Sequence, residues 1–276
     1  MKADWTLSPI STWLDNMRLV FNVWKDHSVI PDAWPVAIVN PFTGESLELE
    51  SDYPNLKPSM SGPAGTGQFI DSSVVYKPSL DMVVYPETPQ LGWNVVLWDR
   101  QAQKAVAKIK DLNEFQHKPL WAPDGTRFVV AVDSRQNQAN NTWTDDWFSA
   151  TEQGEVTQLT HFEDVFVQAE IGPANWSPNG AYLAFWLKAR PSNCPDWNLA
   201  VLDVKSQRAV DYCVPMTTDG YTPAPIWSPD SRFLAVIKNY QSNVSPSQVI
   251  LIDTQMAWAA SVGDSGLPLG WLASTP

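Results

Sequence analysis

The chain has 276 residues, 44% of them hydrophobic and 17% charged, with 15 tryptophans and 23 prolines. This composition is typical of a turn-rich β protein and excludes a disordered chain or a coiled coil. Thirty acidic and eighteen basic side chains give a formal net charge of −12, which disfavours nucleic acid and anionic lipid surfaces as partners. The sequence contains no run of about 18 apolar residues, so a membrane-spanning helix is not predicted.

Two repeats are predicted in the N-terminal part of the chain, each with two pairs of strands. In the first, TWLDNMRLVF (12–21) predicts a hairpin and PVAIVNPFTGE (35–45) predicts the second pair of strands. The second repeat reads VVYKPSLDMVVY (74–85) and then NVVLWDRQAQK (94–104). The segment SMSGPAGTGQ (59–68) is rich in Gly, Pro and Ser, which predicts a loop between the two repeats.

Three clearer repeats follow, and each begins with Trp, a small residue, Pro, Asp or Asn and a turn. Their cores are WAPDGTRFVVAV from Trp121, WSPNGAYLAFWL from Trp176 and WSPDSRFLAVIK from Trp227. The turn residues favour a hairpin, and the almost continuously apolar second strand is typical of a strand covered on both faces. The starts lie 55 and 51 residues apart, a period that suits one four-stranded sheet.

The third and fourth strands of these repeats are predicted from an apolar run that ends in an acidic or small residue before a turn. They begin in WFSATEQGE (147–155), LAVLDVKSQR (199–208) and VILIDTQ (249–255). The polar segments QNQANNTWTDD (136–146) and NYQSNVSPSQ (239–248) predict long loops within the repeats.

Five four-stranded repeats can avoid long open edges by arranging themselves radially around a channel. The sequence therefore predicts an all-β fold, a β-propeller of four-stranded antiparallel blades, as a single domain over residues 1–276. Five blades are predicted, and six blades or an incomplete larger ring are the alternatives. The repeats span about 10–56, 70–112, 115–162, 173–215 and 223–262, with a partial strand over 268–276.

One aromatic residue leads each repeat. These residues are Trp13, Tyr76, Trp121, Trp176 and Trp227, and Trp271 marks a sixth start that the sequence does not complete. Because they occupy equivalent positions, packing between blades explains them better than a set of ligand platforms.

The WSPDG core, followed by an apolar strand and an L-x-V-x-D strand, resembles the repeat of TolB-type, WD-like propellers. Similar repeats occur in the propellers of prolyl-oligopeptidase-type enzymes. The resemblance covers residues 115–160, 173–214 and 223–262 well and the first two repeats poorly. It implies a propeller fold, most often in an exported bacterial protein that binds other proteins or peptides, and it is specific for fold rather than function.

Two short motifs suggest catalysis but lack its chemistry. GPAGTGQF (62–69) has the glycine spacing of a phosphate-binding loop, yet Gln68 stands where a Lys must reach the phosphates. GDSGLP (263–268) places Ser265 as a serine-protease nucleophile would be placed, but no histidine has the sequence context of a triad. A loop and a turn are therefore expected at these two places.

No metal or cofactor is predicted. The three histidines form no closely spaced pair, and the two cysteines are also far apart in sequence, so a zinc site has no basis. The acidic pairs Asp145 with Asp146 and Glu163 with Asp164 lack the ligand spacing of a calcium loop. Solvated loop charge is the expected role of these four carboxylates.

The two cysteines belong to the same repeat. Cys194 precedes the predicted strand WNLAVLDV (197–204), and Cys213 lies in the next strand, AVDYCV (209–214). A hairpin would bring them to the same end of a sheet, where a disulfide would close a short loop and imply an oxidising compartment. A disulfide and two free thiols are both consistent with the sequence.

The N-terminal sequence MKADWTLSPISTW lacks the apolar core of a signal peptide. A cytoplasmic protein has this property, and so does the mature part of an exported protein whose leader has been removed. The second case places the protein outside the cytoplasm, in the periplasm or cell envelope, and the first is the alternative.

The residues that enter each repeat core are expected to line one mouth of the channel, a concave and polar place for a ligand. They are His117, Lys118, Asn175, Tyr221 and Thr222. The sequence therefore predicts a non-catalytic binding or scaffolding module for a protein or peptide partner. The alternatives are a propeller enzyme, such as a five-bladed glycosidase with two carboxylates across the channel, and the regulatory propeller of a peptidase.

Overall fold

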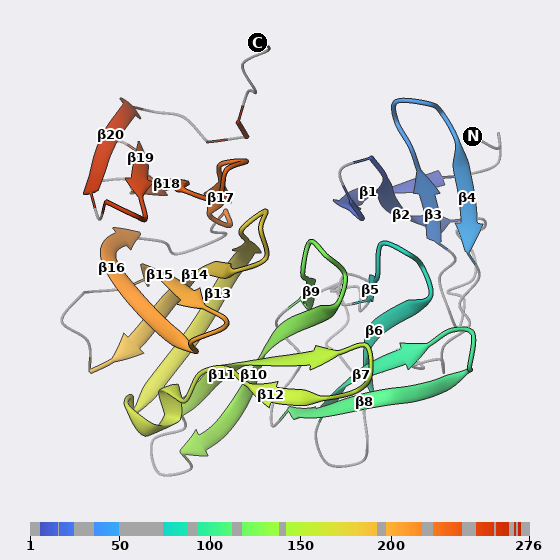
Figure 1. Ribbon diagram of the computed structural model, residues 1–276, viewed down its shortest axis with the longest axis horizontal. Helices are drawn as coiled ribbons and strands as arrows, with labels where there is room; N and C mark the ends of the chain where they lie inside the picture. The colour runs from blue at the N-terminus through green and yellow to red at the C-terminus, as the bar shows by residue number, and fades with distance from the viewer. Residues whose placement is uncertain are drawn as a thin grey trace, which may run out of the picture. The chain divides into compact units, whose positions relative to one another are not determined.

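The computed structural model of the protein describes residues 6–15, 17–24, 36–49, 74–87, 93–111, 118–137, 142–191, 197–216, 223–238, 247–256, 258–264, 268 and 270–271. Nearly all regular structure in these ranges is β-strand (Figure 1). The packing divides the chain into two compact units. The first unit comprises residues 1–121 and 150–156, and the second comprises 122–149 and 157–276.

Two four-stranded antiparallel sheets, blade 1 and blade 2, belong to the first unit. Their strand orders are β1-β2-β3-β4 and β5-β6-β7-β8. The strands of blade 1 are β1 (Thr6–Trp13), β2 (Leu19–Trp24), β3 (Val36–Val39) and β4 (Ser46–Leu49). Those of blade 2 are β5 (Val75–Tyr76), β6 (Met82–Glu87), β7 (Trp93–Asp99) and β8 (Lys104–Asp111).

An eight-stranded sheet contains the next two blades. Its order is β16-β15-β14-β13-β11-β10-β9, with β12 paired to β11. A parallel pairing of Thr144 with Ala169 joins β11 to β13. Blade 3 consists of β9 (Leu120–Trp121), β10 (Arg127–Asn137), β11 (Thr142–Thr151) and β12 (Val156–Gln158). Blade 4 consists of β13 (Gln168–Trp176), β14 (Tyr182–Arg190), β15 (Trp197–Asp203) and β16 (Arg208–Met216).

Blade 5 has the order β17-β18-β19-β20 and belongs to the second unit with blade 4. Its strands are β17 (Ile226–Trp227), β18 (Phe233–Lys238), β19 (Gln248–Asp253) and β20 (Trp258–Asp264). The described strands thus group into five four-stranded blades, which confirms an all-β fold of antiparallel blades. How many blades the complete ring holds stays a prediction.

The turn between the first and second strands explains the Trp-Ser-Pro sequence. In blade 4, Ser177 Oγ donates to Asn179 Oδ1 at 2.7 Å and accepts the backbone N–H of Tyr182 at 2.9 Å. In blade 5, Ser228 accepts the N–H of Phe233 at 2.8 Å in the same way. The serine hydroxyl therefore forms hydrogen bonds both within the turn and with the first residue of the second strand.

The turn between the third and fourth strands explains the acidic residue that ends the third strand. Asp99, Asp203 and Asp253 occupy this position in blades 2, 4 and 5, and each Oδ1 accepts the backbone N–H groups two and three residues later, at 2.8 to 3.1 Å. An Asp side chain in this role fixes a tight turn by replacing a backbone acceptor.

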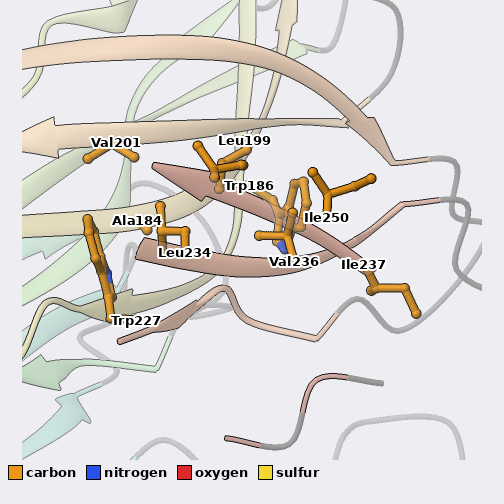
Figure 2. Packing of buried hydrophobic residues seen from close by; sticks show 10 residues of the cluster. Ala184, Trp186, Leu199, Val201, Trp227, Leu234, Val236, Ile237 and Ile250 are labelled. Atoms are coloured by element: carbon orange, nitrogen blue, oxygen red, sulfur yellow. The ribbon is translucent and has the colours of Figure 1, made fainter. Parts of the chain in front are cut away.

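Blades 4 and 5 share a hydrophobic core. Ten buried side chains from β14, β15, β17, β18 and β19 pack together there (Figure 2). Trp186 is fully buried in this core, and its Nε1 donates to the carbonyl oxygen of Pro223 at 2.8 Å. Tyr182, Trp197, Tyr212 and Val214 pack against the core while remaining partly exposed.

The prediction of a long loop over residues 136–146 is wrong, because β10 continues to Asn137 and β11 begins at Thr142. The expected solvation of Asp145 and Asp146 is wrong as well, since they are 5% and 0% exposed. Their carboxylates are buried because polar groups of the fold donate to them. Asp145 Oδ2, for example, accepts the backbone N–H of Ile171 at 2.8 Å.

Candidate functional site

Two of the five residues predicted to line the channel mouth lie within the described ranges. Lys118, two residues before β9, is exposed at the surface, yet desolvation by the protein around it lowers its pKa. Asn175 is exposed near the end of β13, and its Nδ2 donates to the carbonyl oxygen of Pro225 at 3.3 Å. His117, Tyr221 and Thr222 lie outside the described residues, so the mouth stays a prediction.

In each blade, the leading aromatic residue is the last residue of the first strand. These first strands are β1, β5, β9, β13 and β17. Tyr76, Trp176 and Trp227 are 4%, 6% and 5% exposed. Trp121 and Trp271 are partly buried, and the side chain of Trp13 lies outside the described part of the structure. The described leading aromatics therefore offer little open ring surface to a ligand.

Trp227 shows how such a residue contacts the preceding blade. Its Nε1 donates to the carbonyl oxygen of Asn175 at 3.2 Å. Its ring stacks on Tyr182, with the centroids 6.1 Å apart and the planes at 25°. Asn175 comes directly before Trp176, the leading residue of blade 4, and Tyr182 comes six residues after it.

Trp271 repeats this arrangement against blade 5. Its Nε1 donates to the carbonyl oxygen of Ile226 at 3.5 Å, and its ring centroid lies 6.3 Å from that of Phe233. Ile226 comes directly before Trp227 and Phe233 six residues after it. Trp271 thus occupies, against blade 5, the position that Trp227 occupies against blade 4.

A groove of about 330 Å³ lies between blades 4 and 5, within the range of small-molecule and side-chain pockets. We call it the interblade groove. Blade 4 and blade 5 contribute its lining residues, which are Tyr182, Val201, Asp203, Ser206, Arg208, Val210, Tyr212, Trp227, Ser231, Thr254 and Gln255. Arg208, Val210 and Tyr212 alternate along β16, so their side chains share one face of that strand.

Two tyrosines give the groove an aromatic wall with hydroxyl groups. Burial raises the pKa of the Tyr212 hydroxyl, and repulsion from Tyr182 and Asp253 raises it further. The hydroxyl is therefore protonated at neutral pH and can donate a hydrogen bond. Within the described part of the chain, neither phenolic oxygen has a hydrogen-bond partner.

One arginine beside the groove is already paired. Arg232 donates from Nε and Nη2 to Asp253 Oδ2 at 2.9 and 2.6 Å. Asp253 is fully buried, and the hydrogen bonds from Arg232 lower its pKa despite this burial. In this ion pair both nitrogens donate to one carboxylate oxygen, and the two opposite charges compensate each other, so the pair contributes no free charge to the groove.

A second arginine, which lines the groove, is available to bind a ligand. Arg208 is exposed in the groove, and its guanidinium makes no hydrogen bond or ion pair with any residue that the structure describes. Asp203 faces it across the β15–β16 pairing. The Oδ1 of Asp203 accepts backbone N–H groups at 3.0 and 3.1 Å, and these bonds lower its pKa.

One wall residue of the groove is an exposed apolar side chain, and two more exposed apolar side chains follow a lining residue in sequence. Val210 lines it and is 45% exposed. Met256 and Trp258, which follow the lining residue Gln255, are 67% and 43% exposed.

Sequence reasoning missed this groove because its lining comes from two repeats that meet only in the folded chain. One signal was present. Arg208 begins its outer strand opposite Asp203, and Trp258 begins the corresponding strand of blade 5 opposite Asp253. A charged residue thus stands in one repeat where another has an aromatic residue, and such a difference marks a position outside the common packing.

No group of three or more His, Cys, Asp or Glu side chains converges as a metal site would within the ranges that the structure describes. Ser265 and the segment 62–69 lie outside these ranges. Cys213 is disulfide-bonded. Cys194 is not among the described residues, so its pairing with Cys213 stays a prediction.

The part of the chain covered by the structure contains no helix with the length and apolar character of a membrane span. The sequence matches no protein-family model and no curated protein.

Solved structures of the same fold were found. TolB from Acinetobacter baumannii is 11% identical, with a TM-score of 0.56, and the match covers 93% of this chain and 54% of that chain. The β-propeller domain of Cps50 (Swd1) from Myceliophteria thermophila is 12% identical, with a TM-score of 0.50 and coverages of 93% and 71%.

A puromycin-hydrolyzing peptidase from Mycobacterium tuberculosis is 16% identical, with a TM-score of 0.52, and the match covers 96% of this chain and 38% of that chain. The chain therefore spans about half of TolB and a smaller part of the peptidase. At these identities the matches show the fold alone. The chain has the β-propeller fold found in TolB and other WD40-like proteins.

Proposed function

We propose that the protein is a non-catalytic binding module that recognises a peptide or protein partner at the interblade groove. The observation that carries the proposal is the groove itself, a depression of about 330 Å³ with an aromatic wall and an unengaged Arg208. The exposed side chain of Val210 on its wall would add apolar contact area.

A location outside the cytoplasm belongs to the same proposal. The fold is shared with TolB, and the disulfide at Cys213 requires an oxidising compartment to persist.

Selection of binding peptides tests the proposal. A random peptide library displayed on phage is selected against the purified protein, and the affinity of a labelled selected peptide is measured by fluorescence anisotropy. Val210→Glu places a charge on the groove wall and is expected to weaken binding at least about tenfold, because a desolvated charge opposes apolar contact.

Val165→Glu is the matched control, since Val165 is 67% exposed and does not line the groove. It is expected to leave the affinity unchanged. Equal affinities of both variants for the selected peptides would exclude the groove as the binding site.

The alternative is the regulatory propeller of a larger enzyme. The fold match to the mycobacterial peptidase, which covers 96% of this chain, favours it. The complete reading frame of the gene tests this alternative, because it requires a linked catalytic domain.

A further inference from the structure

The interblade groove offers several hydrogen-bond donors that have no partner among the described residues. Arg208 offers a guanidinium with five N–H groups and no acceptor. Tyr182 and Tyr212 add two hydroxyl groups, and Gln255 adds a side-chain amide. A ligand that presents several acceptor atoms close together would pair with these donors.

The acidic groups near the groove are already engaged. Asp253 is paired with Arg232, and Asp203 accepts the backbone N–H groups of Lys205 and Ser206. Their negative charge is thereby partly compensated. The repulsion from the net charge of −12 is also screened at distances beyond about 8 Å at physiological ionic strength.

Two hydroxyls of the groove lining are already engaged: Ser231 Oγ accepts the backbone N–H of Asn179 at 3.0 Å, and Thr254 Oγ1 donates to the carbonyl oxygen of Arg232 at 2.7 Å. The lining also includes apolar side chains. They are Val201, Val210 and Trp227. The site thus combines a donor cluster with a small hydrophobic wall, which fits a carboxylate attached to an apolar body.

We infer that the interblade groove binds a carboxylate of a peptide, with Arg208 as its charged partner and the hydroxyls of Tyr182 and Tyr212 as further donors. This inference rests on the proposed function, because it names the group of the partner that enters the groove. An arginine and a carboxylate match in planar geometry and form two parallel hydrogen bonds. The carboxylate can come from the C-terminus of a peptide or from an acidic side chain.

Three peptides separate these sources. They are acetyl-Ala-Ala-Leu with a free C-terminus, the same peptide as its C-terminal amide, and acetyl-Ala-Glu-Leu-amide. Binding to the intact protein is measured by titration calorimetry. The amide without an acidic side chain is expected to bind at least about tenfold more weakly than the better of the two carboxylate peptides, because it cannot form a charge-assisted bond.

Variants of the protein test the residues. Arg208→Gln is expected to weaken binding of the carboxylate peptide about tenfold or more, and Tyr212→Phe, which keeps the ring, about threefold to tenfold. Lys205→Gln is the matched control, since it removes a positive charge from the exposed turn just before Arg208 and Lys205 does not line the groove. Lys205→Gln should change the affinity by less than about twofold.

Equal binding of the carboxylate and amide peptides would overturn the inference, and so would equal effects of Arg208→Gln and Lys205→Gln. Failure of both carboxylate peptides to bind would overturn it as well. In each case, phage-selected peptides that lack carboxylates and still lose affinity with Val210→Glu would leave the proposed function intact.

Discussion

Asp146 connects three segments of blade 3 through one buried carboxylate. Its Oδ1 accepts from Thr160 Oγ1 at 2.8 Å and from the backbone N–H of Phe162 at 2.7 Å, and its Oδ2 accepts from Ser134 Oγ at 2.7 Å. The sequence presents this residue as one of two adjacent acids in a polar stretch. Only the donors from distant segments explain its burial.

Asp146→Ala is expected to lower the free energy of unfolding by about 3 kcal/mol, because two buried donors and the partly buried Ser134 hydroxyl lose their acceptor. Asp146→Asn, which keeps one carbonyl oxygen, should cost about 1 kcal/mol. Urea denaturation measures both values. Asp124→Ala, at an exposed turn, is the control and should cost about 1 kcal/mol or less.

Burial raises the pKa of Asp146 above its usual value of 3.8, and the hydrogen bonds from Ser134, Phe162 and Thr160 offset only part of this effect. The folded state therefore binds the proton more tightly than the unfolded state does. The resulting stabilisation is complete below the unfolded pKa and is lost as the pH rises through the folded pKa.

The unfolding free energy of the native protein relative to Asp146→Asn should therefore decrease as the pH rises from about 4 toward 7. Urea titrations at a series of pH values provide the comparison. A difference that stays constant or grows with pH would contradict the assigned shift.

At the scale of elements, the β11–β12 turn of blade 3 packs against blade 2 within the first unit. Lys77, which is 8% exposed, forms ion pairs with Glu152 of this turn and with Asp81 at 3.4 Å. Gly154 has a φ of 87°, and a Cβ placed there would lie 2.5 Å from the carbonyl oxygen of Val106. Glycine is required there by both the backbone angle and the close approach.

Gly154→Ala should accordingly destabilise the protein by about 3 kcal/mol, from the left-handed backbone and the contact with Val106 together. Gly44→Ala separates the two causes. Gly44 has a φ of 75°, and a Cβ added to it would have no atom within 4 Å, so only about 1 kcal/mol is expected. Thermal unfolding of both variants measures the difference, and equal losses would remove the role of the contact.

The contact of Trp227 with blade 4 should contribute more to the free energy of unfolding than the contact of Trp271 with blade 5. The reason is burial, since Trp227 is 5% exposed and Trp271 is only half-buried. Trp227→Ala is expected to cost about 4 kcal/mol and Trp271→Ala about 1 to 2 kcal/mol. Guanidinium denaturation provides the values. An unchanged stability of the Trp271 variant would show that this residue makes no contribution to the packing of blade 5.

The hairpins of blades 4 and 5 could be predicted from the sequence because their turn chemistry is local. Ser177 and Ser228 bond to residues within five positions, so a short window contains the whole signal. The interblade groove could not be predicted in this way. Arg208 and Trp227 line one groove only after blades 4 and 5 have packed, and no local sequence pattern records this.

At the scale of the whole molecule, the fold is shared with proteins that are 11 to 16% identical. The sequence predicted this fold because its repeat period and turn residues recur several times. The role of the channel mouth stays a prediction, since three of its five residues lie outside the described ranges. The groove is the site for which the structure supplies a geometry.

The disulfide at Cys213 also acts on the whole chain. If Cys194 is its partner, as predicted, reduction opens a loop of about 20 residues and should lower the unfolding free energy by about 3 kcal/mol. Urea denaturation with and without reductant measures this loss. Peptide mapping under non-reducing conditions identifies the partner, and a linkage between two copies of the chain would contradict the prediction.

The bonds of Trp227 and Trp271 bear on how far such repeats can diverge. Each indole donates to a backbone carbonyl, which belongs to Asn175 in one case and to Ile226 in the other. Because every residue type carries that acceptor, the bond tolerates a polar or an apolar side chain at the same place. The side chains of neighbouring blades can then change during evolution while the blades stay attached to each other. This explains how the fold remains recognisable although no family model matches the sequence.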